Sequence, residues 1–446
     1  MSRRKPSIAV LYHFFPPDDI VSAVHYGDLC SGLASRGWRV SAHPCIWSSH
    51  DGSVRFPPRE EWQGVTVRRM WRPNLRQASD AGRFLNAAWM IFRWSLLSIT
   101  LKPHPDVLLV GTDPILSVSV ASVWKLFSPR TKIVHWCYDA YPEAAVADGL
   151  LPPRGLLTRF FALLMGSAYR KCALIADLGP CMRALLMRYP SPAKRETIVP
   201  WAFEEPDEPL PLAISERLGV FGDVSLALLY SGSFGRAHSS QEILDLAEML
   251  HPHGAKLVFS VRGKRQEELR KEVNQRGAGI EFVPFASPDK LQDRLACADI
   301  HVVTLRPGWA GMVVPSKFFG ALAAGRPVLF AGSVHSSLAL WIRELQIGWV
   351  LTSENVHQVK EQLLSYMNSP EQIDVMQRRC FRVYRERFLR DAQINKFDRL
   401  IRSLVNSDSL SDAPQWPSGE PRLAVEEPLV LASAVKCQPP TDAMGG

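Results

Sequence analysis

The apolar residues of the chain fall into short, uninterrupted runs that recur between longer segments of helical periodicity. The runs at 300–305 and 327–330 show no alternation of polar and apolar positions. Such runs are typical of parallel strands that helices cover on both faces. Between them lie a loop rich in Gly and Pro at 306–315 and an expected apolar helix at 316–324. The loop is therefore expected at the carboxyl end of a strand, where open α/β sheets bind ligands.

The same alternation fills the chain up to about residue 405. At the start, an apolar run at 7–12 is followed by a helical segment at 24–35 and a second run at 38–44. This order is that of a Rossmann-like half, but no G-x-G-x-x-G follows the first run, which argues against a dinucleotide cofactor. Further βα units begin near residue 225, after a linker rich in Glu and Pro. The pattern predicts two Rossmann-like α/β domains.

The limits of the predicted domains follow from these changes of pattern. We expect a first domain at 1–204, a second at 205–380, and a helix at 381–405 that is long enough to pack back on the first domain. From 406 to 446, Ser, Pro, Gly and acidic residues replace the periodic pattern, which predicts a disordered tail.

Composition fits a globular protein and narrows its partners. Of 446 residues, 46% are apolar and 22% are charged, and the net charge is +8. A positive charge suits an anionic substrate or an anionic membrane surface, although a mildly basic enzyme can also carry it without such a role. Nucleic acid is not expected, because the chain has no dense stripe of Lys and Arg with interleaved aromatic residues.

Cysteine usage and the N-terminus bear on location. The eight cysteines include no C-x-x-C pair, which argues against both a zinc cluster and a disulfide framework. The basic start is followed by only a short apolar run, which Pro16 and Pro17 soon end. The start therefore predicts a first strand rather than a signal peptide, and a cytoplasmic protein.

Two segments are unusually apolar. The first, at 84–101, is interrupted by Asn86 and Arg93, and the second, at 156–169, contains and adjoins several Arg residues. Each is consistent with an ordinary packed helix, and each is also consistent with an amphipathic surface that dips into a membrane. On the second interpretation, the protein would associate peripherally with the inner face of the cytoplasmic membrane.

Positive charge gathers around the loop at 306–315. Arg306 opens the loop, and Lys317 lies at the N-terminus of the next helix, where backbone N–H groups and the helix dipole favour an anion. Gly311 would let the backbone approach a ligand closely. These residues predict a cradle for phosphate or diphosphate, although Arg306 could instead form a salt bridge with a loop carboxylate.

Several motifs resemble those of a known family. HFFPPD followed by SRGWRV is similar to the opening of retaining glycosyltransferases of family 4. DAYPEAAVADG, LGPCM, IVPWA, YSGSFGRAH, ACADIHVVTLRPG and VPSKFFGALAAGRPV resemble, in the same order, a subgroup that acts in bacterial surface polysaccharide assembly of the colanic-acid type. The resemblance spans residues 7 to 405. It implies the GT-B fold, in which two Rossmann-like domains face a cleft and a C-terminal helix returns to the first domain.

The chain departs from the family pattern at two acids. The E-x7-E motif of family 4 would fall at Met312 and Gly320, and neither residue is acidic. A family lysine is also missing from 239–241, and we expect Lys317 to replace it, with Arg236 as its partner. The resemblance then implies a cradle for the donor diphosphate. It consists of Arg236, Lys317, Arg306, Gly232, Gly235 and Gly311.

The resemblance also suggests the catalytic residues. Asp139 is the candidate for a general base or an anchor of the acceptor hydroxyl, with a helix cap as the alternative, and Glu143 is its rival. His135, at the end of a strand, is either part of the site or buried and hydrogen-bonded. Ser22 and Ala23, in the N-terminal loop, are expected to bring backbone close to the donor. No metal is expected, and no cofactor other than a nucleoside diphosphate sugar as co-substrate.

The leading hypothesis is a hexosyltransferase. It would move a sugar, with retention, from a nucleoside diphosphate to a lipid-linked or saccharide acceptor in polysaccharide biosynthesis. Two alternatives stay open, an epimerase that acts on a nucleotide sugar and a non-catalytic protein that binds one. The lost acidic pair motivates the last of these.

Overall fold

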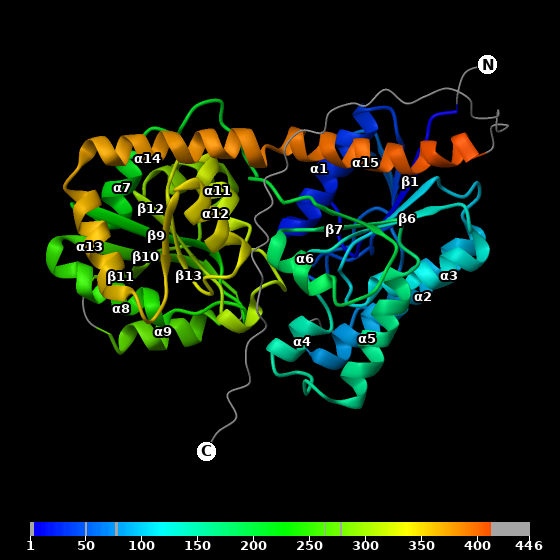
Figure 1. Cartoon of the computed structure of the whole chain (residues 1–446), viewed down its shortest axis with the longest axis horizontal. Coiled ribbons are helices and arrows are strands. Elements are labelled where there is room, and N and C mark those ends of the chain that lie inside the picture. Colours follow the sequence, from blue (N-terminus) through cyan, green and yellow to red (C-terminus); the bar gives the residue numbers. More distant parts are fainter. Residues whose placement is uncertain (1–3, 50, 76–78, 264, 277–278, 412–446) are drawn as a thin grey trace, which may run out of the picture.

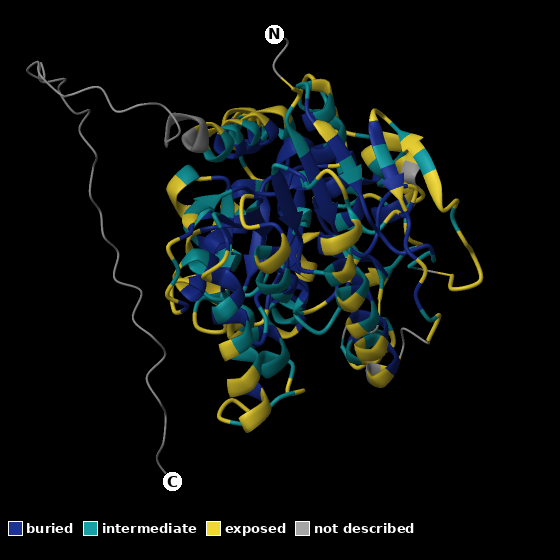
Figure 2. Ribbon diagram, turned by 90° about the vertical axis from the view of Figure 1, so that its right-hand side faces the viewer, coloured by how far each residue is buried: buried dark blue, intermediate teal, exposed yellow. Residues whose placement is uncertain are grey.

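The chain forms two parallel β-sheets flanked by helices (Figure 1). This computed structural model describes residues 4–49, 51–75, 79–263, 265–276 and 279–411. The predicted tail therefore lies outside the described residues from residue 412 onward. Figure 2 shows buried strands at the centre and exposed residues on the outer faces of the helices around them, as expected for sheets covered on both faces.

The first sheet has eight strands in the order β3-β4-β2-β1-β5-β6-β7-β8. All neighbours pair in parallel except β3 and β4, which are antiparallel. The strands are β1 (Ser7–Leu11), β2 (Arg39–Ala42), β3 (Arg59–Trp62), β4 (Val65–Arg68), β5 (Val107–Val110), β6 (Lys132–Trp136), β7 (Leu174–Asp177) and β8 (Lys194–Thr197). The chain changes direction along the sheet between β1 and β5, so the loops after these strands diverge and leave room for a ligand.

The second sheet has six parallel strands in the order β11-β10-β9-β12-β13-β14. The strands are β9 (Leu226–Ser233), β10 (Ala255–Arg262), β11 (Ile280–Phe282), β12 (Ile300–Thr304), β13 (Val328–Ala331) and β14 (Gly348–Leu351). Here the corresponding divergence falls between β9 and β12. The predicted α/β architecture of two Rossmann-like halves is confirmed.

Helices cover both sheets. In the first half they are α1 (Val21–Ser35), α2 (Asp80–Thr100), α3 (Val120–Phe127), α4 (Glu143–Ala147), α5 (Leu156–Tyr169) and α6 (Pro180–Leu186). In the second half they are α7 (Ile214–Phe221), α8 (Gln241–Leu250), α9 (Gln266–Asn274), α10 (Leu291–Ala296), α11 (Lys317–Ala323), α12 (Ser337–Leu345) and α13 (Val356–Met367). Short 3₁₀ helices occupy 117–119, 251–253, 288–290 and 307–309.

Two C-terminal helices run along one edge of both halves (Figure 1). The single long helix expected up to residue 404 or 405 is instead α14 (Pro370–Val383), a π-helical turn (Tyr384–Phe388) and α15 (Arg390–Ser411), with Leu389 extended between them. α15 packs on α1, where Trp38 Nε1 donates a hydrogen bond to Asp398 Oδ1 at 2.6 Å. Helix α15 continues to Ser411, past the expected end at 405.

The linker between the halves is fixed beside this π-helical turn. The Ala202 N–H donates to the Tyr384 hydroxyl at 2.9 Å, and that hydroxyl donates to Glu205 Oε1 at 2.5 Å. The Arg390 N–H also donates to Glu205 Oε1, at 2.7 Å. Both crossings of the chain between the halves, near 202–206 and near 389, are thus joined to each other.

Candidate active site

A cleft of about 960 Å³ lies between the two halves. Its walls include the loops that follow β6, β9 and β12. The cleft therefore lies at the carboxyl ends of these strands, as predicted. The first half and the linker contribute Asp19, Val21, Val24, Asp139, Asp148, Ala202, Phe203, Glu204 and Pro206. The second half contributes 231–233, 235–238, 262, 285–287, 291, 292, 295, 301, 302, 309, 313–317, 320 and 324, and the linker also contributes 210.

Lys317, the first residue of α11, extends along this cleft. Its ammonium group donates to the Ser233 carbonyl at 2.9 Å and lies 5.1 Å from the centre of the Tyr230 ring. Gly232 makes this possible, since a Cβ there would lie 2.6 Å from Lys317 Cε, and its φ of +130° disfavours other residues. Burial lowers the pKa of Lys317 from 10.5 to about 8. No carboxylate of the described residues forms an ion pair with Lys317, so its charge favours an anionic ligand.

Arg236 follows β9 and crosses the cleft. Its guanidinium pairs with the carboxylate of Asp148, which belongs to the first half and is 13% exposed. Gly235 beside it also lines the cleft, and a Cβ there would meet no atom of the described residues within 4 Å. Arg236 and Lys317 thus lie on one wall, as predicted, but Arg236 already has an anionic partner.

Two members of the predicted cradle lie elsewhere. Arg306 is exposed and outside the cleft lining, and its N–H donates to the Ala237 carbonyl at 2.8 Å. Gly311 was expected to let backbone approach a ligand, but a Cβ there would lie 2.8 Å from the Cys181 carbonyl oxygen. The lack of a side chain at Gly311 therefore allows the two halves to come into close contact.

Asp139 lies on the opposite wall of the cleft, in the first half. Burial and the nearby charge of Asp113 raise the pKa of Asp139 to about 7. Asp113 in turn lies 3.2 Å from Nδ1 of the buried His13. A carboxyl group that titrates near neutrality can both accept and release a proton, as a general base requires.

Glu143 and His135 are not among the residues that line the cleft. The Glu143 carboxylate accepts a hydrogen bond from the Tyr189 hydroxyl at 2.6 Å. The His135 ring is buried, with Nδ1 2.9 Å from the Val110 carbonyl oxygen, and burial lowers the pKa of His135 to about 4. The structure does not bring these two candidates to the site, and the buried alternative for His135 is the one observed.

The predicted N-terminal loop is shorter than expected. Helix α1 begins at Val21 instead of near residue 24, so Ser22 and Ala23 lie in its first turn, and Ala23 is fully buried. Their neighbours Val21 and Val24 line the cleft instead. No capping side chain precedes the helix, because Ile20 occupies the N-cap, so the sequence gives no start signal there.

Sequence reasoning missed several cleft residues. Asp148 and Glu204 supply carboxylates, and the guanidinium of Arg262 stacks 4.6 Å from the centre of the Phe285 ring. The linker's run of acidic and Pro residues marked Glu204 as part of a junction, and Asp148 lies in the motif DAYPEAAVADG, but nothing in the sequence assigned either carboxylate to the cleft.

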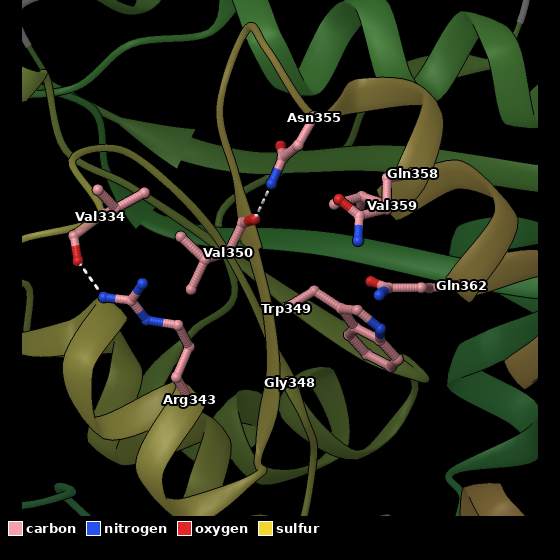
Figure 3. A pocket seen from close by; sticks show the side chains of 9 residues that line it. All are labelled: Val334, Arg343, Gly348, Trp349, Val350, Asn355, Gln358, Val359 and Gln362. Carbon is pink, nitrogen blue, oxygen red and sulfur yellow. Dashed lines mark hydrogen bonds between the residues drawn. The ribbon is translucent and has the colours of Figure 1, made fainter.

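A second, shallower hollow of about 340 Å³ lies on the outer side of β14, against α12 and α13 (Figure 3). Trp349, Arg343, Gln358 and Gln362 are among its lining residues, and Arg343 donates to the Val334 carbonyl. None of the predicted site residues lines it.

Two facing Rossmann-like sheets with a returning C-terminal helix pair define the GT-B class of folds, and comparison with solved structures confirms this prediction. Sucrose-phosphate synthase from Thermosynechococcus elongatus superposes with a TM-score of 0.67 at 15% identity, covering 91% of this chain and 100% of that one. WaaG, a glycosyltransferase involved in lipopolysaccharide biosynthesis, gives a TM-score of 0.61 at 16% identity, with 89% and 99% covered. HepE from Anabaena in complex with UDP gives 0.62 at 9% identity, with 89% and 100% covered.

Sequence comparison points to the same class. Residues 22–202 match the model of the Glycosyl transferase 4-like domain. WbjE of Pseudomonas aeruginosa, whose name describes a probable glycosyltransferase, is 25% identical over 270 residues, or 58% of this chain. WcaI of Escherichia coli (strain K12), whose provisional name describes a glycosyl transferase of colanic acid biosynthesis, is 30% identical over 114 residues, or 25% of this chain. The matched regions span 66% and 28% of these two relatives.

Proposed function

We propose that this protein is a glycosyltransferase that moves a sugar from a nucleoside diphosphate to a saccharide or lipid-linked acceptor during surface polysaccharide synthesis. One observation carries the proposal: the cations Lys317 and Arg236 lie on one wall of the cleft and Asp139 on the other. The UDP and UDP-glucose complexes of HepE support a sugar nucleotide as ligand. The descriptions of WcaI and WaaG support the pathway class, and the name of WbjE supports the type of enzyme.

The cations would act on the leaving group. In the transfer, the bond from the anomeric carbon to the diphosphate breaks and a bond to the acceptor oxygen forms, while the hydroxyl proton passes to the diphosphate or to Asp139. Lys317 and Arg236 would stabilise the charge that grows on the diphosphate. We propose that this charge replaces a metal ion; the described residues contain no group of three metal-ligating side chains.

Retention is part of the same proposal. The acceptor hydroxyl would enter on the face from which the diphosphate leaves, so that the two oxygens lie close together and no protein nucleophile is needed. Asp139 would then position the acceptor hydroxyl, and its pKa near 7 permits it to share the proton.

Diphosphate release tests the proposal. A thermal-shift screen of UDP-, GDP- and dTDP-sugars identifies a donor, and release of its nucleoside diphosphate is then measured with and without lipid-linked acceptors. We expect Lys317→Ala and Arg236→Ala each to lower acceptor-dependent release at least a hundredfold, the size of effect seen when one charge-stabilising donor is removed. Near wild-type turnover in both variants would contradict this placement of the donor.

A binding protein without transferase activity is the second candidate. It is favoured by the lack of acidic side chains at Met312 and Gly320. A donor that binds but is consumed with no acceptor of the panel would support it. Consumption without any acceptor would instead support an epimerase.

We further propose that the first half rests on an anionic membrane. Large apolar side chains are exposed on α2 and α5, among them Phe84, Phe92, Leu156, Phe160 and Leu163, the last 73% exposed. Helix α3, which contacts both, exposes Leu126. Arg154 and Arg159 are exposed among these residues and suit lipid headgroups. No helix in the described ranges combines the length and the apolar character needed to cross a bilayer.

A further inference from the structure

The carboxylates of the cleft differ in where they are held. Four line it among the described residues, Asp19, Asp139, Asp148 and Glu204. The first three come from the first half, and Asp148 is paired with Arg236. Glu204, on the linker, is held instead against the second half, where its Oε2 accepts a hydrogen bond from the side-chain amide of Gln292 on α10. This hydrogen bond joins Glu204 to the second half, whose wall also carries Lys317.

The space beyond Lys317 suits a nucleoside. With the diphosphate at Lys317 and Arg236, the rest of the nucleotide extends along the wall of the second half. That wall offers the Phe285 ring with Arg262 stacked on it, and the apolar side chains of Leu291 and Leu295. Aromatic and aliphatic surfaces suit the binding of a nucleobase. The pentose of the nucleotide would then lie between this surface and the cations.

Gly320 and Glu204 both line the cleft, and each has a neighbour on helix α10. Gly320 lines the cleft without a side chain, and a Cβ there would lie 3.8 Å from Leu295 Cδ1. Leu295 lies about one helical turn after Gln292, the residue that holds the Glu204 carboxylate. Helix α10 therefore contacts both the open space at Gly320, through Leu295, and the Glu204 carboxylate, through Gln292.

We propose that Glu204 accepts hydrogen bonds from the 2′- and 3′-hydroxyls of the donor's ribose, an inference that rests on the function proposed above. A carboxylate can accept from two adjacent hydroxyls at once. The residues on both sides of Glu204 are fixed, since Ala202 and Glu205 are hydrogen-bonded to Tyr384. Such a site selects ribonucleoside diphosphates over deoxythymidine diphosphate.

The test compares UDP and GDP with their 2′,3′-dideoxy analogues, by calorimetric titration of the full chain. We expect the wild type to bind the better ribonucleotide about tenfold more tightly than its dideoxy analogue, the size expected for hydrogen bonds to a charged acceptor. Glu204→Ala should bind both with the affinity that the wild type has for the analogue. Glu208→Ala, an exposed linker carboxylate outside the cleft lining, is the matched control and should keep the discrimination.

A second variant separates a lost contact from a damaged fold. Gly320→Glu, made in the Glu204→Ala background, places a carboxylate on the same wall and should restore the preference for ribose. Discrimination that survives in Glu204→Ala would overturn the assignment of Glu204 and leave the glycosyltransferase proposal intact. Failure of the wild type to bind any nucleoside diphosphate would contradict the proposed function itself, and the role of Glu204 with it.

Discussion

Lys317 carries its charge in surroundings that favour the neutral amine. Burial brings the pKa of Lys317 to about 8, so the ammonium form is lost as the pH rises from 7 to 9. A bound diphosphate would raise this pKa again. We therefore expect donor affinity to fall about tenfold over that range, with proton uptake on binding near pH 8, measured by titration calorimetry in buffers of different ionisation enthalpy. Lys317→Arg, which stays charged, should flatten the profile.

The same lowered pKa has an opposite consequence for the protein without its ligand. A lysine whose pKa falls on folding destabilises the folded state below its folded pKa, and this cost disappears as the pH rises toward 10.5. Lys317→Met should therefore raise the melting temperature at pH 7 and have less effect at pH 10. A lower melting temperature at pH 7 would show that the ammonium group stabilises the unliganded fold.

On the proposed function, Arg236 would exchange Asp148 for the donor diphosphate when a donor binds. Its ion pair with Asp148 is 41% exposed on the arginine side, and pairs of this kind contribute roughly 1 kcal/mol. Asp148→Asn should therefore tighten binding of the nucleoside diphosphate about fivefold. Asp207→Asn, an exposed linker acid outside the cleft lining, is the control. Weaker binding in Asp148→Asn would mean that Asp148 orients Arg236 for the ligand.

At the scale of single residues, the sequence allowed us to predict those whose position depends on neighbouring parts of the chain. Gly232 lies near the end of β9 and Lys317 follows the loop after β12, and both places can be found from the apolar runs that predict these strands. The Asp148 partner of Arg236 could not be found, because folding joins positions 88 apart in the sequence. Glu143 and Gly311 failed for a related reason. Gly311 lies in the expected loop and Glu143 begins α4, but the contacts of these residues depend on Cys181 and Tyr189, which are distant in the sequence.

At the scale of elements, the end of β9 and the start of α11 form one unit. Gly232→Ala should place a methyl group against the Lys317 side chain in a strained backbone conformation. We expect a stability loss of about 1–2 kcal/mol and at least tenfold weaker donor binding. Gly235→Ala, where the methyl group would have free space, should change both by little. Thermal unfolding and calorimetric titration measure the two effects.

Element boundaries were predictable where a breaker or cap marks them. Gly37 ends the turn after α1 and Gly325 follows α11, and the expected helix ends at 35 and 324 lie close to these glycines. The interruption between α14 and α15 has no such mark. The π-helical turn packs Phe388 against Phe318, Phe319 and Trp341 of the second half, so tertiary packing rather than local propensity accounts for it.

At the scale of the molecule, the exposed apolar helices predict where the protein contacts lipid. The chain should sediment with vesicles containing anionic phospholipid at low salt, and less at high salt, because screening weakens the attraction of Arg to headgroups. Phe160→Glu with Leu163→Glu on α5 should reduce sedimentation at least fivefold. Leu218→Glu, on the equally exposed α7 of the second half, should not. Equal loss in both would argue against an oriented membrane contact.

The two crossings between the halves have a mechanical consequence. Hydrogen bonds from Tyr384 and Arg390 to Glu205 join the first crossing to the second. The two crossings therefore form one connection along one side of the molecule. We therefore expect any opening of the cleft to be a rotation about these joined crossings, because a twist of one half over the other would break the hydrogen bonds of Glu205.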